Sequence, residues 1–327
     1  MEAQLSGGVR HSWLKHFHIT FFGMVFGMTG FTLAVQMAST IFSPLLLPAG
    51  HLIRYATVIL MITIVSIYLL KLVRFPEAVS SEWIHPNKIN FFPLFGMSLL
   101  VLGSSFFKSH PKVSLILWVS GTVLQFLSSV IVVSIWAGQT HFRIEHMTPG
   151  WFIPIVGSII VPIAGVKHGF IELSWFFFTV GLFFWLALFT IVMYRIVFHP
   201  PIPERLLPTL FIMIAPPALG FISYINFTGG ELDAFARILY YVSLFIFLML
   251  IFWLPVLAKI KFSLSWWATS FPVAAKVQAS IIYFGLSNDQ FFKVLALFEF
   301  GFLVLVIFVL IFRTIVAALN KEICVEE

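Results

Sequence analysis

Ten long apolar stretches fill this chain almost end to end, and they constrain its fold more than any other feature. A helix needs ~20 apolar residues to cross a lipid bilayer. Only 10% of the 327 residues are charged, whereas about a quarter are charged in soluble domains, so a soluble fold is excluded. The predicted spans are residues 16–39, 50–73, 91–107, 112–137, 150–167, 171–197, 207–226, 234–258, 265–286 and 290–318. We therefore predict an all-α integral membrane protein, with residues 1–327 forming a single transmembrane domain.

The odd-numbered spans differ in kind from the even-numbered ones. They contain no Asp or Glu, and they carry most of the prolines that fall within spans: Pro93, Pro154, Pro162, Pro208, Pro216, Pro217 and Pro272. Proline inside a helix removes a backbone hydrogen bond and kinks the helix. In lipid, the freed carbonyl must be buried in protein or face water. We therefore predict an inner ring of odd spans with kinks at Pro93, Pro154, Pro216 and Pro272, although membrane helices are in general enriched in Gly and Pro.

The order of the spans predicts how they pair and which way they cross the membrane. The odd spans start at roughly regular intervals after the first, which indicates five helical hairpins whose even helices, rich in Phe, Leu, Ile and Val, face lipid. With the N-terminus inside, 12 of the 19 Lys and Arg residues lie on the inner side, 6 lie on the outer side and Lys276 lies within the membrane. Because cytoplasmic loops carry the excess of Lys and Arg, both termini are predicted to be cytoplasmic. The first apolar stretch is too long for a signal-peptide core, so it is predicted to be a retained helix.

Charge also limits what a pore between these helices could conduct. Cation pores commonly use rings of acidic side chains, and the odd spans have none, which fits a pore for anions or for neutral solutes. These spans offer neutral hydrogen-bond donors instead: Thr20, Ser98, Ser158, Ser223, Thr269, Ser270 and Gln278.

Sequence patterns for an enzyme are absent. There is no Gly-rich phosphate loop, nucleophile elbow or zincin motif, so we predict neither enzymatic activity nor a cofactor. The single cysteine, Cys324, excludes an internal disulfide. His16 and His18 could bind a metal, but no acidic or Cys partner lies near them in sequence, and a place at the cytoplasmic interface suits their polar rings better. We therefore predict no metal site. The Lys and Arg residues lie at helix ends rather than in one patch, so no nucleic-acid partner is predicted.

Five short motifs occur in order along the odd spans and in the loop after the seventh span. They are Phe21-Phe22-Gly23-Met24-Val25-Phe26-Gly27, Pro149-Gly150-Trp151-Phe152-Ile153-Pro154, Ala215-Pro216-Pro217, Gly230-Glu231-Leu232-Asp233 and Trp266-Trp267-Ala268-Thr269-Ser270-Phe271-Pro272. Together they resemble the tellurite-resistance/dicarboxylate transporter family, which includes bacterial TehA and the plant slow anion channels. The resemblance implies ten transmembrane helices, as five hairpins in a quasi-fivefold arrangement around a central pore, and a homotrimer.

The resemblance also implies a gate, because the family's Trp-Ala-x-x-Phe motif places Phe271 as the plug of the pore. Composition could not select this residue, since the chain has 40 Phe. Pro272 directly after it can bend the helix and direct the ring inward. At 100° per residue, Ala275 and Gln278 lie on the same face as Phe271. The small Ala275 would leave space for the ring to move, and Gln278 would be a polar lining residue. The resemblance further implies that the following residues line or contact the pore: Phe22, Gly23 and Phe26.

Two charged residues, Lys276 and Glu299, fall inside the ninth and tenth spans. In an antiparallel hairpin they reach the same depth, and a lone charge in the membrane costs several kcal/mol, so we predict a structural ion pair. The alternative is that Lys276 faces the pore and attracts anions. Glu231 and Asp233 precede the eighth span, where the helix dipole favours acids, and are predicted to be caps.

Two functions fit this sequence. The first is a gated channel for small anions, such as chloride or nitrate, occluded by Phe271. The alternative is a secondary transporter, with or without proton coupling, of dicarboxylates or related oxyanions, linked to tellurite resistance. In either case we expect a multi-pass protein surrounded by the lipid of the plasma membrane, which in a bacterium is the inner membrane.

Overall fold

The computed structural model describes residues 13–140 and 142–325, and every regular element within them is helical. Long α-helices occupy the positions of the even spans: α2 (Leu46–Arg74), α5 (Pro111–Gly138), α8 (Ile171–Phe198), α10 (Ala234–Phe252) with the short α11 (Leu254–Leu257), and α13 (Gln290–Leu319). Segments that mix 3₁₀ (η) and α turns occupy the odd positions: η1 (Ile19–Phe21) with α1 (Phe22–Ile41), η2 (Lys88–Phe91) with α4 (Leu94–Phe106), η4 (Pro149–Trp151) to α7 (Val161–Gly165) through α6 (Phe152–Val156) and η5 (Gly157–Ile160), η6 (Glu204–Ile214) with α9 (Ala215–Phe227), and η7 (Leu264–Thr269) with α12 (Ser270–Ser287).

Eight of the helical stretches in the described part of the chain are long and apolar enough to cross a membrane. The other two predicted spans correspond to Pro149–Gly165, which is apolar but shorter, and to Leu264–Ser287. The all-helical membrane class predicted from the sequence is therefore confirmed.

Burial separates the two kinds of helix. In the most apolar part of Ile19–Ile41 and of Lys88–Phe106, 72% of the residues are buried, and in Glu204–Phe227 the share is 89%. The long even helices bury only 22–39% of theirs. A helix that is apolar all round and mostly exposed suits contact with lipid, whereas the odd segments lie inside the bundle.

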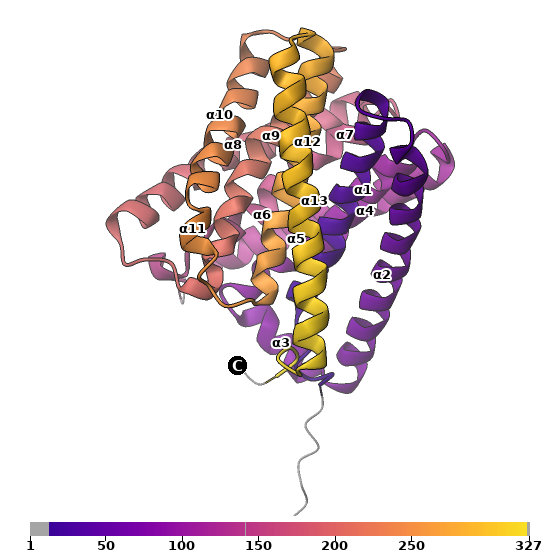
Figure 1. Ribbon diagram of the computed structural model, residues 1–327. Helices are drawn as coiled ribbons and strands as arrows, with labels where there is room; N and C mark the ends of the chain where they lie inside the picture. The colour runs from indigo at the N-terminus through magenta and orange to yellow at the C-terminus, as the bar shows by residue number, and fades with distance from the viewer. Residues whose placement is uncertain (1–12, 141, 326–327) are drawn as a thin grey trace, which may run out of the picture.

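Contacts between the odd segments form a closed cycle. Helix α1 packs against α4 and α12, α12 packs against α9, and α9 packs against α7, which returns to α4. Each even helix packs on the odd segment that precedes it, as α2 does on α1 and α13 does on α12. Figure 1 shows α2 and α13 as long outer helices, with α4, α6 and α9 among the elements behind them.

The sequence predicted that four prolines kink the inner helices. In the structure these prolines lie close to breaks between 3₁₀ and α turns rather than inside continuous α-helices. Pro93 is the N-cap of α4, Pro216 lies in the first turn of α9, and Pro272 is the third residue of α12. Proline is tolerated there because the first N–H groups of a helix have no helical acceptor. Pro154 lies in α6, which ends two residues later at Val156.

Backbone carbonyls in the broken segment Pro149–Gly165 are satisfied by side chains of neighbouring helices. The Pro154 carbonyl oxygen accepts hydrogen bonds from Gln125 Nε2 at 2.8 Å and from Ser129 Oγ at 2.6 Å, both on α5. Trp118 Nε1 donates to the Val161 carbonyl oxygen at 2.8 Å. These bonds allow irregular backbone within the apolar bundle, where an unpaired carbonyl would be costly.

One further helix lies between the second and third predicted spans, where the sequence predicted no span. Residues 74–90 contain α3 (Pro76–Ile84), which begins with Pro76 and ends before His85. It is held by Glu82, whose carboxylate accepts hydrogen bonds from Lys71 Nζ and Tyr68 Oη of α2, each at 2.7 Å.

Candidate functional site

A cavity of about 270 Å³ opens at the end of the molecule where the odd segments begin. We call it the vestibule. All five odd segments contribute to its wall, through residues such as Gly23, Leu94, Val156, Leu219 and Phe271. Because each odd segment starts with 3₁₀ turns at this end, the wall combines irregular backbone with the first α turns.

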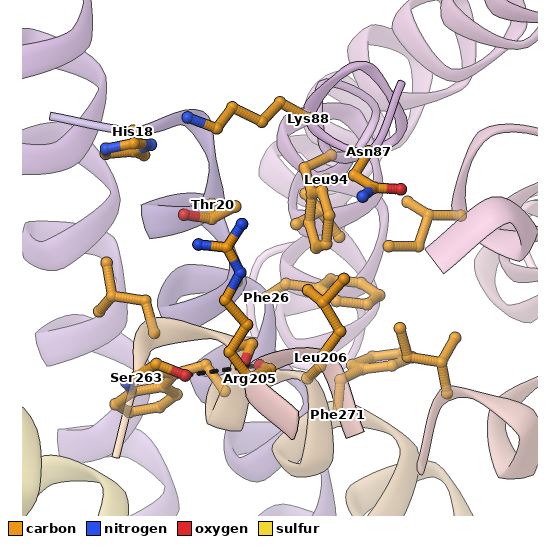
Figure 2. A pocket seen from close by; sticks show the side chains of 18 of the residues that line it. His18, Thr20, Phe26, Asn87, Lys88, Leu94, Arg205, Leu206, Ser263 and Phe271 are labelled. Atoms are coloured by element: carbon orange, nitrogen blue, oxygen red, sulfur yellow. Dashed lines mark hydrogen bonds between the residues drawn. The ribbon is translucent and has the colours of Figure 1, made fainter. Parts of the chain in front are cut away.

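Phe26 of α1 and Phe271 of α12 are both part of the vestibule lining, and their rings stack on each other. Their centroids are 3.6 Å apart and the ring planes differ by 22°. Phe271 is only 3% exposed. A Cβ built on Gly30 would lie 2.7 Å from Cδ2 of Phe271, so the ring occupies space that is open only because residue 30 is glycine. The predicted gate residue of α12 is thus packed against α1, at Phe26 and Gly30; Figure 2 labels both aromatic residues.

The other residues predicted on this pathway are distributed between the vestibule and its surroundings. Gly23 lines the vestibule. Phe22 packs edge-to-face against Tyr68 and Phe95 instead, and so joins α1 to its neighbours. Ala275 and Gln278 are buried further along α12 and do not line the vestibule. Gln278 Nε2 donates to the Gly30 carbonyl oxygen at 3.3 Å, which ties α12 to α1 beyond the aromatic stack.

The mouth of the vestibule has an excess of positive charge. Lys88 and Arg205 line it together with His18 and His85, and Glu322 supplies the one carboxylate among the described lining residues. Figure 2 shows the Arg205 guanidinium near Thr20 and the Lys88 ammonium near His18. The Arg205 backbone is anchored because its carbonyl oxygen accepts a hydrogen bond from Ser265 Oγ, across η6 and η7. Fixed cations at a narrow mouth raise the local concentration of anions.

Most of the hydroxyl groups that the sequence offered as donors are used by the fold. Ser98, Thr269 and Ser270 donate to carbonyl oxygens three or four residues earlier in their own segments. Ser223 Oγ donates to the Ile159 carbonyl oxygen at 2.6 Å and so stabilises the broken segment. A hydroxyl has one hydrogen to donate, so these groups serve the backbone. Thr20 is the hydroxyl of the predicted set that lines the vestibule.

Lys276 and Glu299 meet away from the vestibule, on the hairpin of α12 and α13. The Nζ of Lys276 lies 3.2 Å from Oε1 of Glu299, and neither side chain is exposed. Lys276 also donates to Ser280 Oγ at 2.7 Å, and its ammonium lies 4.1 Å from the Tyr240 ring centroid. Lys276 is not a vestibule residue, so this geometry supports the structural pair rather than an anion-attracting lysine.

The C-terminal residues return to the mouth, which the sequence did not indicate. Glu322, Ile323, Cys324 and Val325 all line the vestibule. Burial raises the pKa of the Cys324 thiol to about 11, against a smaller lowering by Lys71. Ile323 packs against the apolar core. No sequence pattern indicates this contact, because it joins segments that are distant along the chain.

The predicted acidic cap is present at the opposite end. Asp233 is the N-cap of α10, where its Oδ1 accepts from the Ala236 N–H at 2.8 Å and its Oδ2 accepts from Tyr224 Oη at 2.6 Å. These bonds, the one from Ala236 above all, hold the pKa of Asp233 below its usual range. Glu231 lies two residues before this cap.

Metal ligands do not gather in the part of the chain that the structure describes: no three His, Cys, Asp or Glu residues are placed to hold an ion together. His18 of the His-x-His pair lies at the mouth, with Nδ1 4.0 Å from Oε1 of Glu82.

These features define a multi-pass helical membrane protein whose buried segments surround a basic vestibule. The family model described as SLAC1, voltage-dependent anion channel, matches residues 16–315, and the chain belongs to this family. This confirms the resemblance drawn from the motifs. The uncharacterized transporter MJ0762 of Methanocaldococcus jannaschii is 28% identical over 95% of this chain and 96% of its own length.

Two further relatives carry functional names. The S-type anion channel SLAH3 of Arabidopsis thaliana is 28% identical over 97% of this chain and 51% of its own length. The tellurite resistance protein TehA homolog of Haemophilus influenzae is 23% identical over 90% of this chain and 89% of its own.

Proposed function

We propose that this chain is a gated channel that conducts small anions, such as chloride or nitrate, through a central pore between the five odd segments, closed by Phe271. The observation that carries this proposal is the stack of Phe271 on Phe26 in the lining of the vestibule. The names of relatives such as SLAH3 support the transport of anions. The quasi-fivefold arrangement of ten helices belongs to the same proposal, supported by the closed cycle of contacts.

Phe271 would act as a gate in two ways. Its ring fills the narrow part of the pathway, and an apolar constriction also excludes water and with it hydrated ions. Opening would require the ring to leave Phe26 and Gly30. Ala275, one turn along α12, has a small side chain that would obstruct such a rotation little. Beyond the ring, Gln278 and the wall of α1 would continue the path.

Selection for anions would come from the electrostatics of the whole path. Lys88 and Arg205 face the mouth, and the inner helices contribute no acid to the vestibule wall among the described residues. A positive mouth with low-dielectric walls concentrates anions and repels cations.

The second candidate function is a secondary transporter of dicarboxylates or related oxyanions, and the name of the TehA homolog is the observation that favours it. A proton-coupled carrier needs a titratable group on its path. The titratable side chains among the described vestibule residues, such as His18, His85 and Glu322, lie at the mouth, while Lys276 is paired with Glu299 elsewhere. Beyond the mouth the inner helices therefore offer little for coupling, and the channel is favoured.

We also propose that the protein is a homotrimer with both termini in the cytoplasm, so that the vestibule faces the cytoplasm. The excess of Lys and Arg predicted for this side supports the orientation. Native mass spectrometry of the purified protein tests the trimer, and a monomer as the sole species would contradict it.

Channel and carrier are separated by the driving force each obeys. In a planar bilayer under a chloride gradient, a channel gives a current whose reversal potential approaches that of chloride once the gate is open. In liposomes, a coupled carrier accumulates a radiolabelled dicarboxylate when a pH gradient is imposed. Accumulation driven by the pH gradient, with no chloride current from any variant of the gate, would replace the channel by the carrier.

A further inference from the structure

The wall of the vestibule is mostly apolar, and a hydrated inorganic anion gains little from such a wall. Each of the five odd segments contributes at least one apolar side chain to it: Phe26, Leu94, Phe152, Leu219 and Phe271. Small-molecule sites in proteins are cavities of roughly 300 Å³ or more, lined mainly by apolar and aromatic side chains with a few placed polar groups. At about 270 Å³, the vestibule is close to this size and has this kind of lining. Its wall therefore suits a ligand with an apolar body.

The mouth offers two polar groups to the head of such a ligand. The Arg205 guanidinium and the Thr20 hydroxyl both line the vestibule, and neither has a partner among the described side chains. Figure 2 shows the guanidinium near Thr20. Glu322, the carboxylate of the lining, accepts a hydrogen bond from Asn320 Nδ2 at 3.2 Å within its own segment. A guanidinium presents two parallel N–H groups to a carboxylate, so this end suits a carboxylate head.

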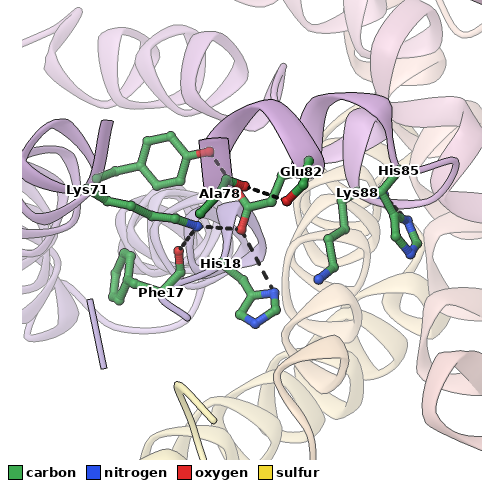
Figure 3. Close-up of polar contacts among 9 residues, drawn as sticks. Phe17, His18, Lys71, Ala78, Glu82, His85 and Lys88 are labelled. Atoms are coloured by element: carbon green, nitrogen blue, oxygen red, sulfur yellow. Dashed lines mark hydrogen bonds and ion pairs between the residues drawn. The ribbon is translucent and has the colours of Figure 1, made fainter. Parts of the chain in front are cut away.

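The other basic groups at this end are already engaged. His18 Nδ1 lies 4.0 Å from Glu82 Oε1, and the same oxygen pairs with Lys71 Nζ at 2.7 Å (Figure 3). Lys88 and His85 also have interaction partners. The head of a ligand is therefore assigned to Arg205 and not to these groups.

The spacing along the first odd segment sets the length of the ligand. Thr20 lies six residues before Phe26. At about 1.5 Å per residue, the polar rim and the aromatic stack are roughly 9 Å apart. A ligand with one charged end and an apolar body of this length reaches both. A dicarboxylate of the same length would place its second charge against Phe26 and Phe271, where its lost hydration is not replaced.

We propose that the vestibule is a binding site for amphipathic monocarboxylates of about the length of octanoate, and that these ligands block the path. The carboxylate accepts hydrogen bonds from the Arg205 guanidinium and the Thr20 hydroxyl, and the chain lies against the rings of Phe26 and Phe271. The bound chain fills the space in front of the gate ring, so anions no longer enter. The block rests on the proposed channel function, whereas the binding does not.

Binding is tested by equilibrium dialysis of radiolabelled octanoate against the full chain in phosphatidylcholine nanodiscs. Empty nanodiscs measure the octanoate that enters lipid, and we expect saturable binding above that background. Acetate has the head group alone and should compete at least about tenfold more weakly than octanoate, because each buried methylene adds several-fold in affinity. Octanamide has the apolar body without the charge and should also compete about tenfold more weakly.

The variant Arg205→Gln tests the assignment of the head group. Its affinity for octanoate should fall about tenfold, while octanamide binds it as it binds the native protein, which shows that the cavity is intact. Arg205 is exposed, so this variant should fold. The matched control is Arg313→Gln, because Arg313 is exposed on α13 and does not line the vestibule.

Three results overturn the site. The first is octanoate binding no greater than that of empty nanodiscs, and the second is acetate competing as well as octanoate. The third is equal affinity of the native protein for octanoate and octanamide, a comparison that depends on no variant. A folded Arg205→Gln protein that binds octanoate as the native protein does overturns the role of Arg205.

The block is measured as chloride current through Gly30→Ala protein in a planar bilayer, because this variant keeps both rings of the wall. Octanoate on the vestibule side, at a concentration near its dissociation constant, should lower the current about twofold. The current should not fall when Arg205→Gln is added to the same protein. Bound octanoate that leaves the current unchanged overturns the block. If dialysis shows binding while no gate variant conducts chloride, the site stands and the proposed channel function fails.

Discussion

Lys276 of α12 and Glu299 of α13 form an ion pair within one hairpin, with Nζ and Oε1 3.2 Å apart and both side chains fully buried. Removing one partner leaves a buried charge alone, which costs about 3–5 kcal/mol, whereas replacing both by apolar residues is often neutral. We predict that Glu299→Gln lowers the yield of folded protein strongly, and that Lys276→Met with Glu299→Leu restores it. Size-exclusion chromatography of membrane extracts measures the folded yield.

Equal yields of native protein, single variant and double variant would contradict a structural role for this pair. If instead Lys276 attracts anions in the pore, Lys276→Met with Glu299→Leu would fold well and lose conductance. We expect the Lys276→Met with Glu299→Leu variant to conduct as well as the protein without these two changes when both are measured with the gate open.

Gln125 and Ser129 of α5 both donate to the Pro154 carbonyl oxygen in the broken segment. Leaving a buried carbonyl without a partner costs about 1–3 kcal/mol, so Gln125→Leu with Ser129→Ala should lower the thermal unfolding midpoint of the purified protein. The matched control is Thr122→Val on the same helix, because the buried Thr122 hydroxyl has no hydrogen-bond partner among the described residues. A midpoint shift as large in the control would contradict the account.

Gly30 provides a test of the gate that leaves the gate residue unchanged. A Cβ at this position would lie 2.7 Å from the Phe271 ring, so Gly30→Ala should displace the ring and raise the basal chloride current. Gly285→Ala on α12 is the control, since nothing lies within 4 Å of a Cβ built there. Unchanged current in Gly30→Ala, with normal expression, would show that the ring position does not control conduction.

Cys324 is the single cysteine and lies at the vestibule mouth, so it reports on the C-terminal segment without background. Its pKa is raised from 9.0 to about 11 by burial. Below both values this lowers the thiolate fraction roughly a hundredfold, and labelling by a charged maleimide at pH 8 should slow accordingly. Labelling as fast as that of a free thiol would contradict the packed position of this segment. Labelling only from the cytoplasmic side of membrane vesicles would support the proposed orientation.

Hydropathy predicted the helices well because spanning segments need long apolar runs. The predicted span 171–197 is found as Ile171–Phe198, and 290–318 as Gln290–Leu319. The Lys276–Glu299 contact followed from matching depths in an antiparallel hairpin. Helix α3 was missed because it is short and is held by Lys71 and Tyr68 of another helix, which is a tertiary effect.

The site was less accessible to sequence reasoning than the fold. Phe271 was identified from the family resemblance, since nothing in the composition distinguishes it among the 40 Phe residues of the chain. Its partner Phe26 was named, but the stack depends on how α1 and α12 pack. The basic mouth was missed because Lys88 and Arg205 lie far apart in sequence and were counted only as loop charges. The use of Ser98 and Ser223 by backbone carbonyls likewise depends on local and tertiary geometry.

The central claim is that Phe271 closes an anion path, and the most direct measurement compares chloride currents of native protein and Phe271→Ala in a planar bilayer. Phe22→Ala serves as the control, because Phe22 is a buried ring of the same helix as Phe26 that packs against Tyr68 and Phe95 rather than in the vestibule. We predict little current from the native protein and from the control, and a large current from Phe271→Ala that reverses near the chloride equilibrium potential. A folded Phe271→Ala protein that conducts no more than the native protein would contradict the account.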